Sequence, residues 1–378
     1  MTNRRILIAA GGTGGHFYPG FALGQELRSR GWQVLFLVKK HDLACPALDA
    51  ADLPYAETDM ISLPRSFNPA AHAVFLLKLL SSLALARRII ADFRPDAVLG
   101  TGSYVAFPAL LAARFGGVKT YIHESNAKFG LGNYLAGFFC DLAALGLPMR
   151  ANPFSAKSKL TGTPVRAAFA VMPAKVAAIA ALGLQSGQLT VLVFGGSQGA
   201  RRINKAAVSS AAAFKGQFQL IHLTGRKNLE EITAAYDAAG LAGAPWLKVF
   251  DYREDMPQLY AAADLVFSRA GAGTIAELAL MGKPALLAPL PSSAGGHQKD
   301  NAMVLAGSGA AACLAEDADF EAGVIRFLEE QITRPGKIAQ MAGNFKKAGI
   351  PDALKAAGLL ADLIEAGTHT TRRLSDGN

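Results

Sequence analysis

The stretch ILIAAGGTGGHFYPG, residues 6–20, decides the fold because a short apolar run leads straight into a turn rich in glycine. Residues 6–10 have the length and composition of a buried strand. Four glycines, Thr13 and His16 follow, and Pro19 suits the first turn of a helix, where its missing N–H breaks no hydrogen bond. The stretch therefore predicts a strand, a tight turn and a helix in succession.

A second stretch, VLVFGGSQGAR at residues 191–201, repeats the order of apolar run, double glycine, small hydroxyl residue, glycine and helix. Continuous apolar strands that alternate with helices are typical of parallel sheets covered on both faces. We therefore predict an α/β protein with two Rossmann-like, doubly wound domains in tandem. Other apolar runs of strand length, with helical patterns between them, are 34–38, 97–99, 120–122, 190–194, 220–223, 265–267 and 285–290.

The length of 378 residues exceeds what one core organises and suits two domains. Glycine and proline interrupt the pattern at TGTPVR, residues 161–166. We place the N-terminal domain at 1–163 and the C-terminal domain at 164–342. A C-terminal helix at about 343–368 is expected to pack back on the first domain, and 369–378 is expected to be a disordered tail.

The formal net charge is +9, and it is concentrated in the first half of the chain. Residues 1–163 contain 17 Lys and Arg against 10 Asp and Glu, a balance of +7, which leaves +2 for the remainder. This bias predicts contact with phosphate groups or an anionic membrane surface. We expect no nucleic acid partner, because no basic run is interleaved with aromatic residues.

Cysteine usage and hydropathy restrict the class of protein further. Cys45, Cys140 and Cys313 have no CxxC spacing, so neither a disulfide framework nor a zinc site is expected, and a reducing cytoplasm fits. The apolar run 6–10 follows two arginines but is too short for an export signal. No stretch of about 18 apolar residues is present, so we predict no transmembrane helix.

Both glycine turns suit an anion. A strand that ends in such a turn leaves the first N–H groups of the next helix unpaired, and the helix dipole adds partial positive charge. For either turn alone, tight packing explains the glycines equally well, whereas two copies favour phosphate binding.

A nicotinamide-binding protein is the main competitor. Residues 12–17 lack the third glycine of GxGxxG, and no acidic residue follows the second strand at 39–41, which disfavours this class. Lys39 and Lys40 keep an NADP-binding alternative open. Neither turn is followed by the GK[ST] of a Walker A motif.

A third glycine turn lies within FSRAGAGTIAELALMGKPAL, residues 267–286. A helix is expected to start near Thr274, with Thr274 and Glu277 as a capping box. In the functional interpretation, the N–H groups of residues 272–274 bind a diphosphate and Glu277 accepts hydrogen bonds from two adjacent hydroxyls. Both interpretations stay open at this point.

The motifs, taken in order, resemble those of the MurG family of bacterial glycosyltransferases. The resemblance covers about residues 5–310. It implies a GT-B fold, with two Rossmann-like domains facing across a cleft. The motifs are GGTGGH, GTGSYVAFP at 100–108, HESN at 123–126, GTPVR at 162–166, GGSQGAR, RAGAGTIAE at 269–277 and HQKDNA at 297–302.

The implied activity is that of an N-acetylglucosaminyltransferase without a cofactor. It is the inverting transfer of N-acetylglucosamine from UDP-GlcNAc to the C4 hydroxyl of undecaprenyl-pyrophosphoryl-MurNAc-pentapeptide, which turns lipid I into lipid II. Such an enzyme serves peptidoglycan synthesis, and with it cell wall biogenesis, cell shape and cell division.

The resemblance also implies roles for residues at matching positions. Glu277 would hold the ribose hydroxyls, Arg253 would read uracil through its backbone, and His297 and Gln298 would bind the sugar hydroxyls. Further donor contacts are implied for Thr13, Gly14, Gly15, Asn126, Arg166, Ser197, Ala272, Gly273 and Thr274. The implied acceptor side consists of Thr13, His16, Tyr104, His123, Glu124 and Asn126.

Three departures from the family pattern bear on the acceptor. Gly102-Ser103-Tyr104 stands where the family usually has two glycines before the tyrosine, Ala106 replaces a usual serine, and HESN replaces HEQN. A related glycosyltransferase with another lipid or small-molecule acceptor therefore remains an alternative. A catalytically silent nucleotide-sugar-binding protein is a further one, although the candidate base and the ribose-binding glutamate are both present.

Inverting transfer needs a base for the attacking hydroxyl and positive charge for the leaving UDP. His16 is expected just before a helix, whose dipole opposes protonation and favours a neutral imidazole. We take His16 as the candidate catalytic base and His123 with Glu124 as its rival; a purely structural role is the alternative for each. Arg166 and Arg269 are expected near phosphate, because a guanidinium binds such oxygens bidentately.

No metal site is expected. The one DxD pattern, Asp317 to Asp319, lies beyond the motifs and is typical of a solvated surface turn. Helix dipoles can take the place of a cation at a diphosphate.

Residues 72–88, HAVFLLKLLSSLALARR, predict a helix whose apolar side is wider than a core-facing stripe requires. A buried core helix is the plain interpretation. The excess apolar width in a basic domain favours a membrane patch of Phe75, Leu76, Lys78 and Leu79 on anionic lipid. We therefore expect a peripheral protein at the cytoplasmic face of the inner cell membrane, with other cell-wall synthesis proteins as partners.

Overall fold

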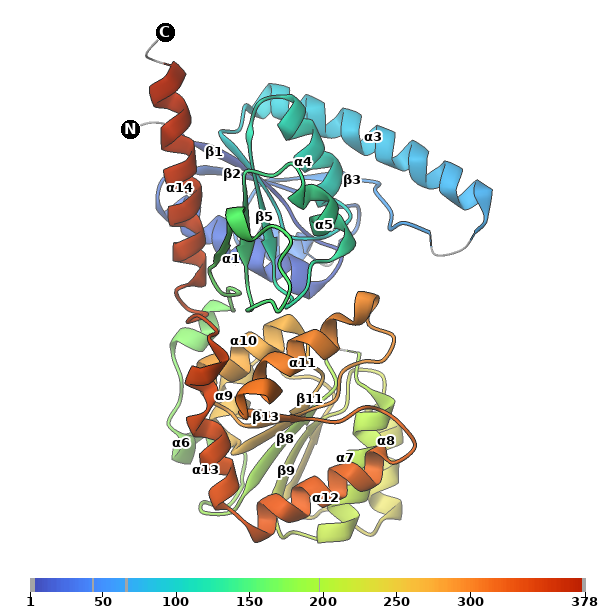
Figure 1. The fold of residues 1–378 in the computed structure, drawn as a ribbon. Coiled ribbons are helices and arrows are strands. Elements are labelled where there is room, and N and C mark those ends of the chain that lie inside the picture. Colours follow the sequence, from blue (N-terminus) through green and yellow to red (C-terminus); the bar gives the residue numbers. More distant parts are fainter. Residues whose placement is uncertain (1–3, 43, 65–66, 197, 376–378) are drawn as a thin grey trace. The chain divides into compact units, whose positions relative to one another are not determined.

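A computed structural model describes residues 4–42, 44–64, 67–196 and 198–375. The chain divides into two compact units (Figure 1). The first unit combines Met1–Arg166 with Pro351–Asn378, and the second is Ala167–Ile350. The second unit is therefore inserted into the first along the chain.

The first unit contains one parallel sheet with the strand order β3-β2-β1-β4-β5-β6-β7. Ile8 in β1 pairs with Phe36 in β2 and with Leu99 in β4. The strands are β1 (Arg5–Ala9), β2 (Gln33–Lys39), β3 (Tyr55–Thr58), β4 (Ala97–Gly100), β5 (Lys119–Glu124), β6 (Leu142–Leu145) and β7 (Ser158–Leu160).

Strand β1 is apolar from Ile6 to Ala9 because both faces of the sheet are covered. Ile6 and Ile8 belong to a core shared with α1 and α14, whereas Leu7 and Ala9 belong to a core shared with α3 and α4. This alternation explains why the run at 6–10 lacks the polar positions of a half-exposed strand. The helices of this unit are α1 (Gly14–Ser29), α2 (Cys45–Ala50), α3 (Pro69–Phe93), α4 (Ala106–Phe115), α5 (Leu131–Gly137) and α14 (Ala356–Ser375), with a 3₁₀ turn η1 (Ser155–Lys157).

Helix α14 lies against α1 in the first unit (Figure 1). Leu360, Ala361 and Ile364 are fully buried there. The polar edge is fixed by Arg30, whose Nη1 donates to Asp362 Oδ1 at 2.6 Å and to Glu365 Oε2 at 2.9 Å.

The C-terminal elements differ from the expected single helix at 343–368. Gly349 adopts a left-handed φ of 65°, and Pro351 follows, so the chain breaks there and α14 begins only at Ala356. The expected disordered tail at 369–378 is also not seen over most of its length, because α14 continues to Ser375. No proline interrupts this helix, and its two glycines, Gly358 and Gly367, lie within it. Residues 376–378 lie outside the described residues.

The second unit contains a parallel sheet with the strand order β10-β9-β8-β11-β12-β13. Both sheets extend in two directions from a central pair, β1 with β4 and β8 with β11, which is the doubly wound Rossmann order. The predicted fold class is thus confirmed. The strands are β8 (Thr190–Phe194), β9 (Gln219–Leu223), β10 (Leu247–Phe250), β11 (Leu265–Ser268), β12 (Ala285–Leu287) and β13 (Ala311–Cys313).

Helices cover both faces of the second sheet (Figure 1). Val191 and Val193 of β8 point into a core shared with α7 and α12. The helices of this unit are α6 (Lys175–Ala181), α7 (Arg201–Phe214), α8 (Leu229–Ala238), α9 (Met256–Ala262), α10 (Ala272–Met281), α11 (His297–Ser308), α12 (Phe320–Thr333) and α13 (Gly336–Gly343), and the 3₁₀ turns are η2 (Ala167–Ala170), η3 (Ala294–Gly296) and η4 (Phe345–Ala348). Across the described parts of both units, no helix has the length and apolar character that crossing a bilayer requires.

Candidate active site

The glycine turn of the first unit connects β1 to α1. Gly11 and Gly12 have φ values of 134° and 81°, a region that favours glycine. The N–H of Gly12 donates to Asp42 Oδ2 at 2.6 Å. The Tyr104 ring lies beside the turn, since a Cβ on Gly12 would stand 3.5 Å from its Cε1.

Helix α1 begins within the glycine motif. Its N-cap is Thr13, whose side chain makes no capping hydrogen bond, and Thr13, Gly14 and Gly15 are exposed. The first N–H groups of α1 therefore face solvent together with the positive end of the helix dipole.

His16 occupies the first turn of α1, not the position before the helix that we expected, because the two glycines ahead of it are already helical. Its Nδ1 lies 2.9 Å from the carbonyl oxygen of Thr101. A carbonyl only accepts hydrogen bonds, so Nδ1 carries the proton in the neutral ring and Nε2 keeps its lone pair. The half-buried ring is thus oriented to accept a proton at Nε2.

His123 does not have this freedom. It is fully buried at the end of β5, its Nε2 lies 3.1 Å from Gly162 O, and its Nδ1 lies 3.3 Å from Ser125 Oγ. Burial lowers the pKa of His123 below its ordinary value. Both ring nitrogens of His123 are occupied and the ring has no access to solvent. It therefore cannot take a proton from the hydroxyl of an acceptor substrate, which argues against His123 as the catalytic base.

Glu124 organises the loop that follows β5. Its Oε1 accepts from the backbone N and Nδ2 of Asn126, at 3.0 and 2.9 Å. Its Oε2 accepts from Gly130 N at 3.0 Å and from Asn133 Nδ2 at 2.9 Å. Four hydrogen bonds leave this buried carboxylate no role as a base, and Glu124 instead holds Asn126 at the loop.

The corresponding turn of the second unit packs tightly. A Cβ on Gly195 would lie 2.4 Å from Ala200 N, and one on Gly199 would lie 2.1 Å from the carbonyl oxygen of Thr224. Helix α7 starts directly after this turn, at Arg201. Ser197, predicted to contact the donor, lies outside the described residues.

Helix α10 begins at Ala272 with Gly271 as its N-cap, two residues earlier than predicted. Thr274 and Glu277 are therefore inside the helix, and the expected capping box does not form. Ala272 is buried, whereas Gly273 and Thr274 are half-buried at the helix start. The helix begins early because Gly271 reaches the N-cap conformation without a side-chain acceptor.

Glu277 lies on α10 beyond its first turn and is half-buried. Its Oε2 accepts from the hydroxyl of Tyr260 at 3.0 Å. Tyr260 itself is fully buried in α9. This bond fixes the direction of the carboxylate relative to the start of α10.

The predicted cations have different surroundings. Arg269 donates to Ala288 O at 3.0 Å and pairs with Glu316 at 2.6 Å, with side-chain exposures of 13% and 6%, so it is a structural ion-pair residue and not a phosphate ligand as expected. Arg253 pairs with Asp255 ahead of α9 and lies over the Phe250 ring. Arg166 is half-buried at the end of the first segment of the first unit.

Two predicted sugar-binding residues begin helix α11. His297 follows Gly295 and Gly296, both of which have positive φ. The Oε1 of Gln298 accepts from Leu290 N at 2.9 Å, which ties the helix start to the preceding loop. Within the described residues, the buried Nδ1 of His297 has no hydrogen-bond partner.

The predicted membrane patch is rearranged on α3. Phe75 and Leu79 pack against the core between α3 and α4, and Lys78 pairs with Asp59 at 3.5 Å. Leu76 is 53% exposed, as predicted for the patch. The prediction placed Phe75 and Leu79 outward because it lacked the position of α4, which covers that side. The exposed apolar residues of α3, here called the α3 patch, are Val74, Leu76, Leu77 and Leu80.

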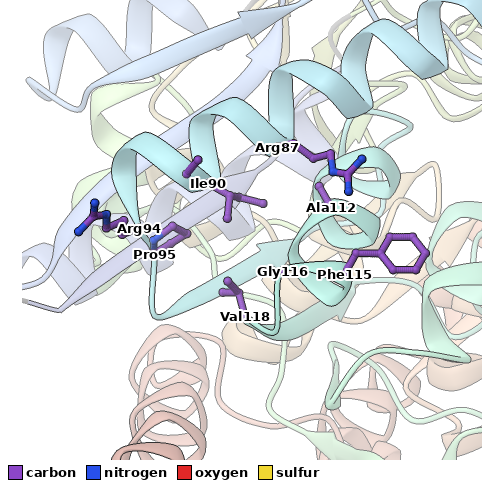
Figure 2. A pocket seen from close by; sticks show the side chains of 9 residues that line it. Arg87, Ile90, Arg94, Pro95, Ala112, Phe115, Gly116 and Val118 are labelled. Atoms are coloured by element: carbon purple, nitrogen blue, oxygen red, sulfur yellow. The ribbon is translucent and has the colours of Figure 1, made fainter.

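A groove of about 430 Å³ lies where the C-terminal ends of α3 and α4 meet (Figure 2). Arg87 of α3 and Arg94, the residue directly after α3, line it, together with Phe115 of α4, which is 72% exposed. In Figure 1 the N-terminal half of α3 extends beyond α4. The α3 patch and this groove thus lie along one helix.

Asp42, Tyr260 and Asn133 were not predicted from the sequence. Asp42 lies 30 residues from the glycine turn that it contacts, and no motif marks it. The described residues contain no cluster of three or more His, Cys, Asp or Glu side chains that could hold a metal ion.

Known proteins match this chain over nearly its full length. Residues 6–144 match the glycosyltransferase family 28 N-terminal domain and residues 190–356 its C-terminal domain. A relative from Elusimicrobium minutum is 36% identical over 366 residues, 96% of this chain and 99% of the relative. One from Halorhodospira halophila is 37% identical, with coverages of 97% and 100%. Both are named UDP-N-acetylglucosamine--N-acetylmuramyl-(pentapeptide) pyrophosphoryl-undecaprenol N-acetylglucosamine transferase.

Solved structures show the same likeness. The crystal structure of Acinetobacter baumannii MurG has a TM-score of 0.77 at 27% identity and covers 96% of this chain and 99% of its own. The glycosyltransferase of kitacinnamycin has a TM-score of 0.71 at 19% identity, which shows a shared fold.

Proposed function

The chain belongs to glycosyltransferase family 28 and, within it, to the MurG family of N-acetylglucosamine transferases, and from this premise we propose that it transfers N-acetylglucosamine from UDP-GlcNAc to lipid I. The proposed acceptor atom is the C4 hydroxyl of the MurNAc sugar, and the products are lipid II and UDP. The observation that carries the catalytic part is the His16 ring, whose Nδ1 is bound to Thr101 O and whose Nε2 keeps a lone pair.

The donor is proposed to bind the second unit. The N–H groups at the start of α10, residues 272–274, and those at the start of α7 would face the diphosphate, because helix N-termini stabilise negative charge. Glu277, held by Tyr260, would accept from both ribose hydroxyls. His297 and Gln298 would bind the sugar hydroxyls, and the backbone of Arg253 would contact uracil, as the family resemblance implies.

The acceptor is proposed to bind the first unit beside Thr13, Tyr104 and Asn126. Nε2 of His16 would take the proton from the C4 hydroxyl as that oxygen forms a bond to C1 of the donor sugar. The bond from C1 to the diphosphate oxygen breaks at the same carbon, with inversion, and UDP leaves with the bonding electrons. Arg166 and the helix N-termini would stabilise the charge on the leaving group.

The test is incubation of the purified chain with UDP-GlcNAc and lipid I, with the lipid-linked disaccharide measured. His16→Ala is expected to lower turnover by about a hundredfold or more, since a positioned base contributes about that much. His41→Asn is the matched control, because His41 is exposed in the same unit and its positive φ of 55° suits Asn. Normal turnover in His16→Ala would reject the base. No disaccharide from the unmodified chain would reject the reaction, and a titration of UDP-GlcNAc against UDP-glucose defines the donor.

We further propose that the first unit rests on the cytoplasmic face of an anionic membrane through the α3 patch. Its exposed leucines supply apolar area, and Arg87 and Arg94 at the adjoining groove supply positive charge toward lipid phosphates. A polyprenyl-linked acceptor gives such a surface a purpose.

Leu77→Ser combined with Leu80→Ser should abolish most binding to vesicles that contain anionic lipid. Leu354→Ser combined with Leu359→Ser is the control, since both leucines are exposed apolar residues elsewhere in the same unit, at 43% and 42%. Equal vesicle binding by the two double variants would contradict the α3 patch as the anchor.

One observation keeps a second candidate function in view, namely a family 28 glycosyltransferase with a different acceptor. Ser103 stands in the altered acceptor loop, and its buried Oγ has no partner among the described residues. This hydroxyl is a hydrogen-bonding group that the double glycine of the family pattern lacks, so it distinguishes the acceptor loop of this chain. Product formation with lipid I at a rate unaffected by Ser103→Gly would count against this alternative.

A further inference from the structure

A buried hydrogen-bond network of Tyr236, His222 and Asn204 crosses the core of the second unit beneath the start of α7. His222 is the penultimate residue of β9 and is fully buried. Its Nδ1 lies 2.8 Å from the hydroxyl of Tyr236 in α8, and its Nε2 lies 3.1 Å from Oδ1 of Asn204 in α7. Asn204 Nδ2 in turn donates to the carbonyl oxygen of Thr224 at 2.9 Å.

The donor and acceptor of each hydrogen bond in this network can be assigned. Asn204 uses its amide nitrogen on Thr224 O, so its Oδ1 accepts and His222 must donate from Nε2. The Nδ1 of His222 then accepts from the hydroxyl of Tyr236. Burial lowers the pKa of His222 to about 3, which keeps the ring neutral as this arrangement requires.

Thr224 connects the hydrogen-bond network to the glycine turn that precedes α7. A Cβ on Gly199 would stand 2.1 Å from Thr224 O, and one on Gly225 would stand 2.3 Å from Gly199 N, so the two backbone segments are in direct contact. Asn228 Nδ2 bridges the same segments, with 3.0 Å to Thr224 O and 3.1 Å to Gln198 O. A displacement of Thr224 would therefore displace the residues at which α7 begins.

We propose that Tyr236, His222 and Asn204 are positioning residues for the donor: their hydrogen-bond chain holds the backbone at Thr224 against Gly199, and so holds the N–H groups at the start of α7 toward the diphosphate. The inference rests on the proposed function, because it takes that helix start as part of the donor site. None of the three side chains is exposed, so they act through the backbone and touch no ligand.

The experiment compares Tyr236→Phe and Asn204→Leu with Ser210→Ala in the full chain. Ser210 is the matched control, because its buried hydroxyl lies on α7 and has no partner within the described residues. We expect the two network variants to bind UDP-GlcNAc about three- to tenfold more weakly by calorimetry, which corresponds to the loss of one buried hydrogen bond. The KM for the acceptor should stay within about twofold of the unmodified chain, as should both constants in Ser210→Ala.

Two results would overturn the positioning role. One is donor affinity in both network variants equal to that of Ser210→Ala; the other is a parallel rise in the acceptor KM, which indicates general loosening. A wild-type chain that binds no UDP-sugar would overturn the proposed function as well, so the two failures are distinguishable. Ring ¹⁵N NMR of the unmodified protein adds a test that needs no variant. The Nε2–H tautomer of His222 is expected, and an Nδ1–H tautomer would contradict the proposed hydrogen-bond network.

Discussion

The second unit should unfold at a higher pH than titration of its carboxylates alone would cause, because His222 must stay neutral in the folded state. Its pKa is lowered from 6.5 to about 3 by burial. The unfolded chain binds a proton at His222 below pH 6.5, whereas the folded chain does not, so the free energy of unfolding falls as the pH falls through this range. The full difference of about 3.5 pH units amounts to roughly 5 kcal/mol, of which about 2 kcal/mol is lost by pH 5.

The assay uses the two tryptophans, Trp32 in the first unit and Trp246 in the second. In a Trp32→Phe background, fluorescence during urea unfolding reports the second unit alone. The free energy of unfolding is measured at pH 7.5 and at pH 5, with and without His222→Gln. His222→Gln removes the titrating ring. The free energy of unfolding of this variant should therefore fall by about 2 kcal/mol less between pH 7.5 and pH 5 than that of the protein with His222. An equal pH dependence in both proteins would refute the reasoning.

Three further outcomes are expected. Gly199→Ala should destabilise the second unit more than Gly187→Ala. Both glycines have positive φ, but only a Cβ at Gly199 would meet backbone, at 2.1 Å from the carbonyl oxygen of Thr224. The midpoints of urea unfolding compare the two variants, and equal shifts would show that φ strain alone determines the loss. Ile364→Ala should cost about 2–5 kcal/mol of unfolding free energy, whereas Leu359→Ala, on the exposed side of α14, should cost under about 0.5 kcal/mol; similar losses would contradict the packing of α14. Glu277→Gln should weaken UDP-GlcNAc binding about tenfold by calorimetry, because a hydrogen bond to a charged group is worth about 1.5–3 kcal/mol, and unchanged affinity with the exposed Glu329→Gln as reference would remove the ribose role.

Secondary structure was predictable where burial leaves a one-dimensional signal. The runs at 6–10 and 190–194 are apolar because helices cover both faces of the central strands, and both were found. The four edge strands, β3, β7, β10 and β13, were not, because few of their residues are buried. Strand β6 is buried but was also missed, because its four residues include two alanines and give only a weak apolar signal. The start of α10 was placed two residues late because Thr274 and Glu277 match a capping box, which Gly271 makes unnecessary.

The candidate site was predictable as a set of motifs but not as a set of contacts. The sequence places His16 and His123 in comparable loops, and only tertiary packing separates them: one ring keeps a lone pair near solvent, while the other is enclosed with both nitrogens occupied. Asp42 and Tyr260 act across long separations in the chain, for which no local pattern exists. The outward side of α3 likewise depends on α4, which residues 72–88 alone do not reveal.

The insertion of the second unit into the first has a consequence for synthesis of the chain on the ribosome. Leu360 and Ile364 complete a core that begins with Ile6 and Ile8, so the earliest residues to emerge wait for the latest. The inserted unit, finished by Ile350, can fold while the surrounding one still lacks its last helix. Until that helix arrives, the nascent first unit exposes the apolar surface that α14 later covers, and at this stage chaperone protection matters most.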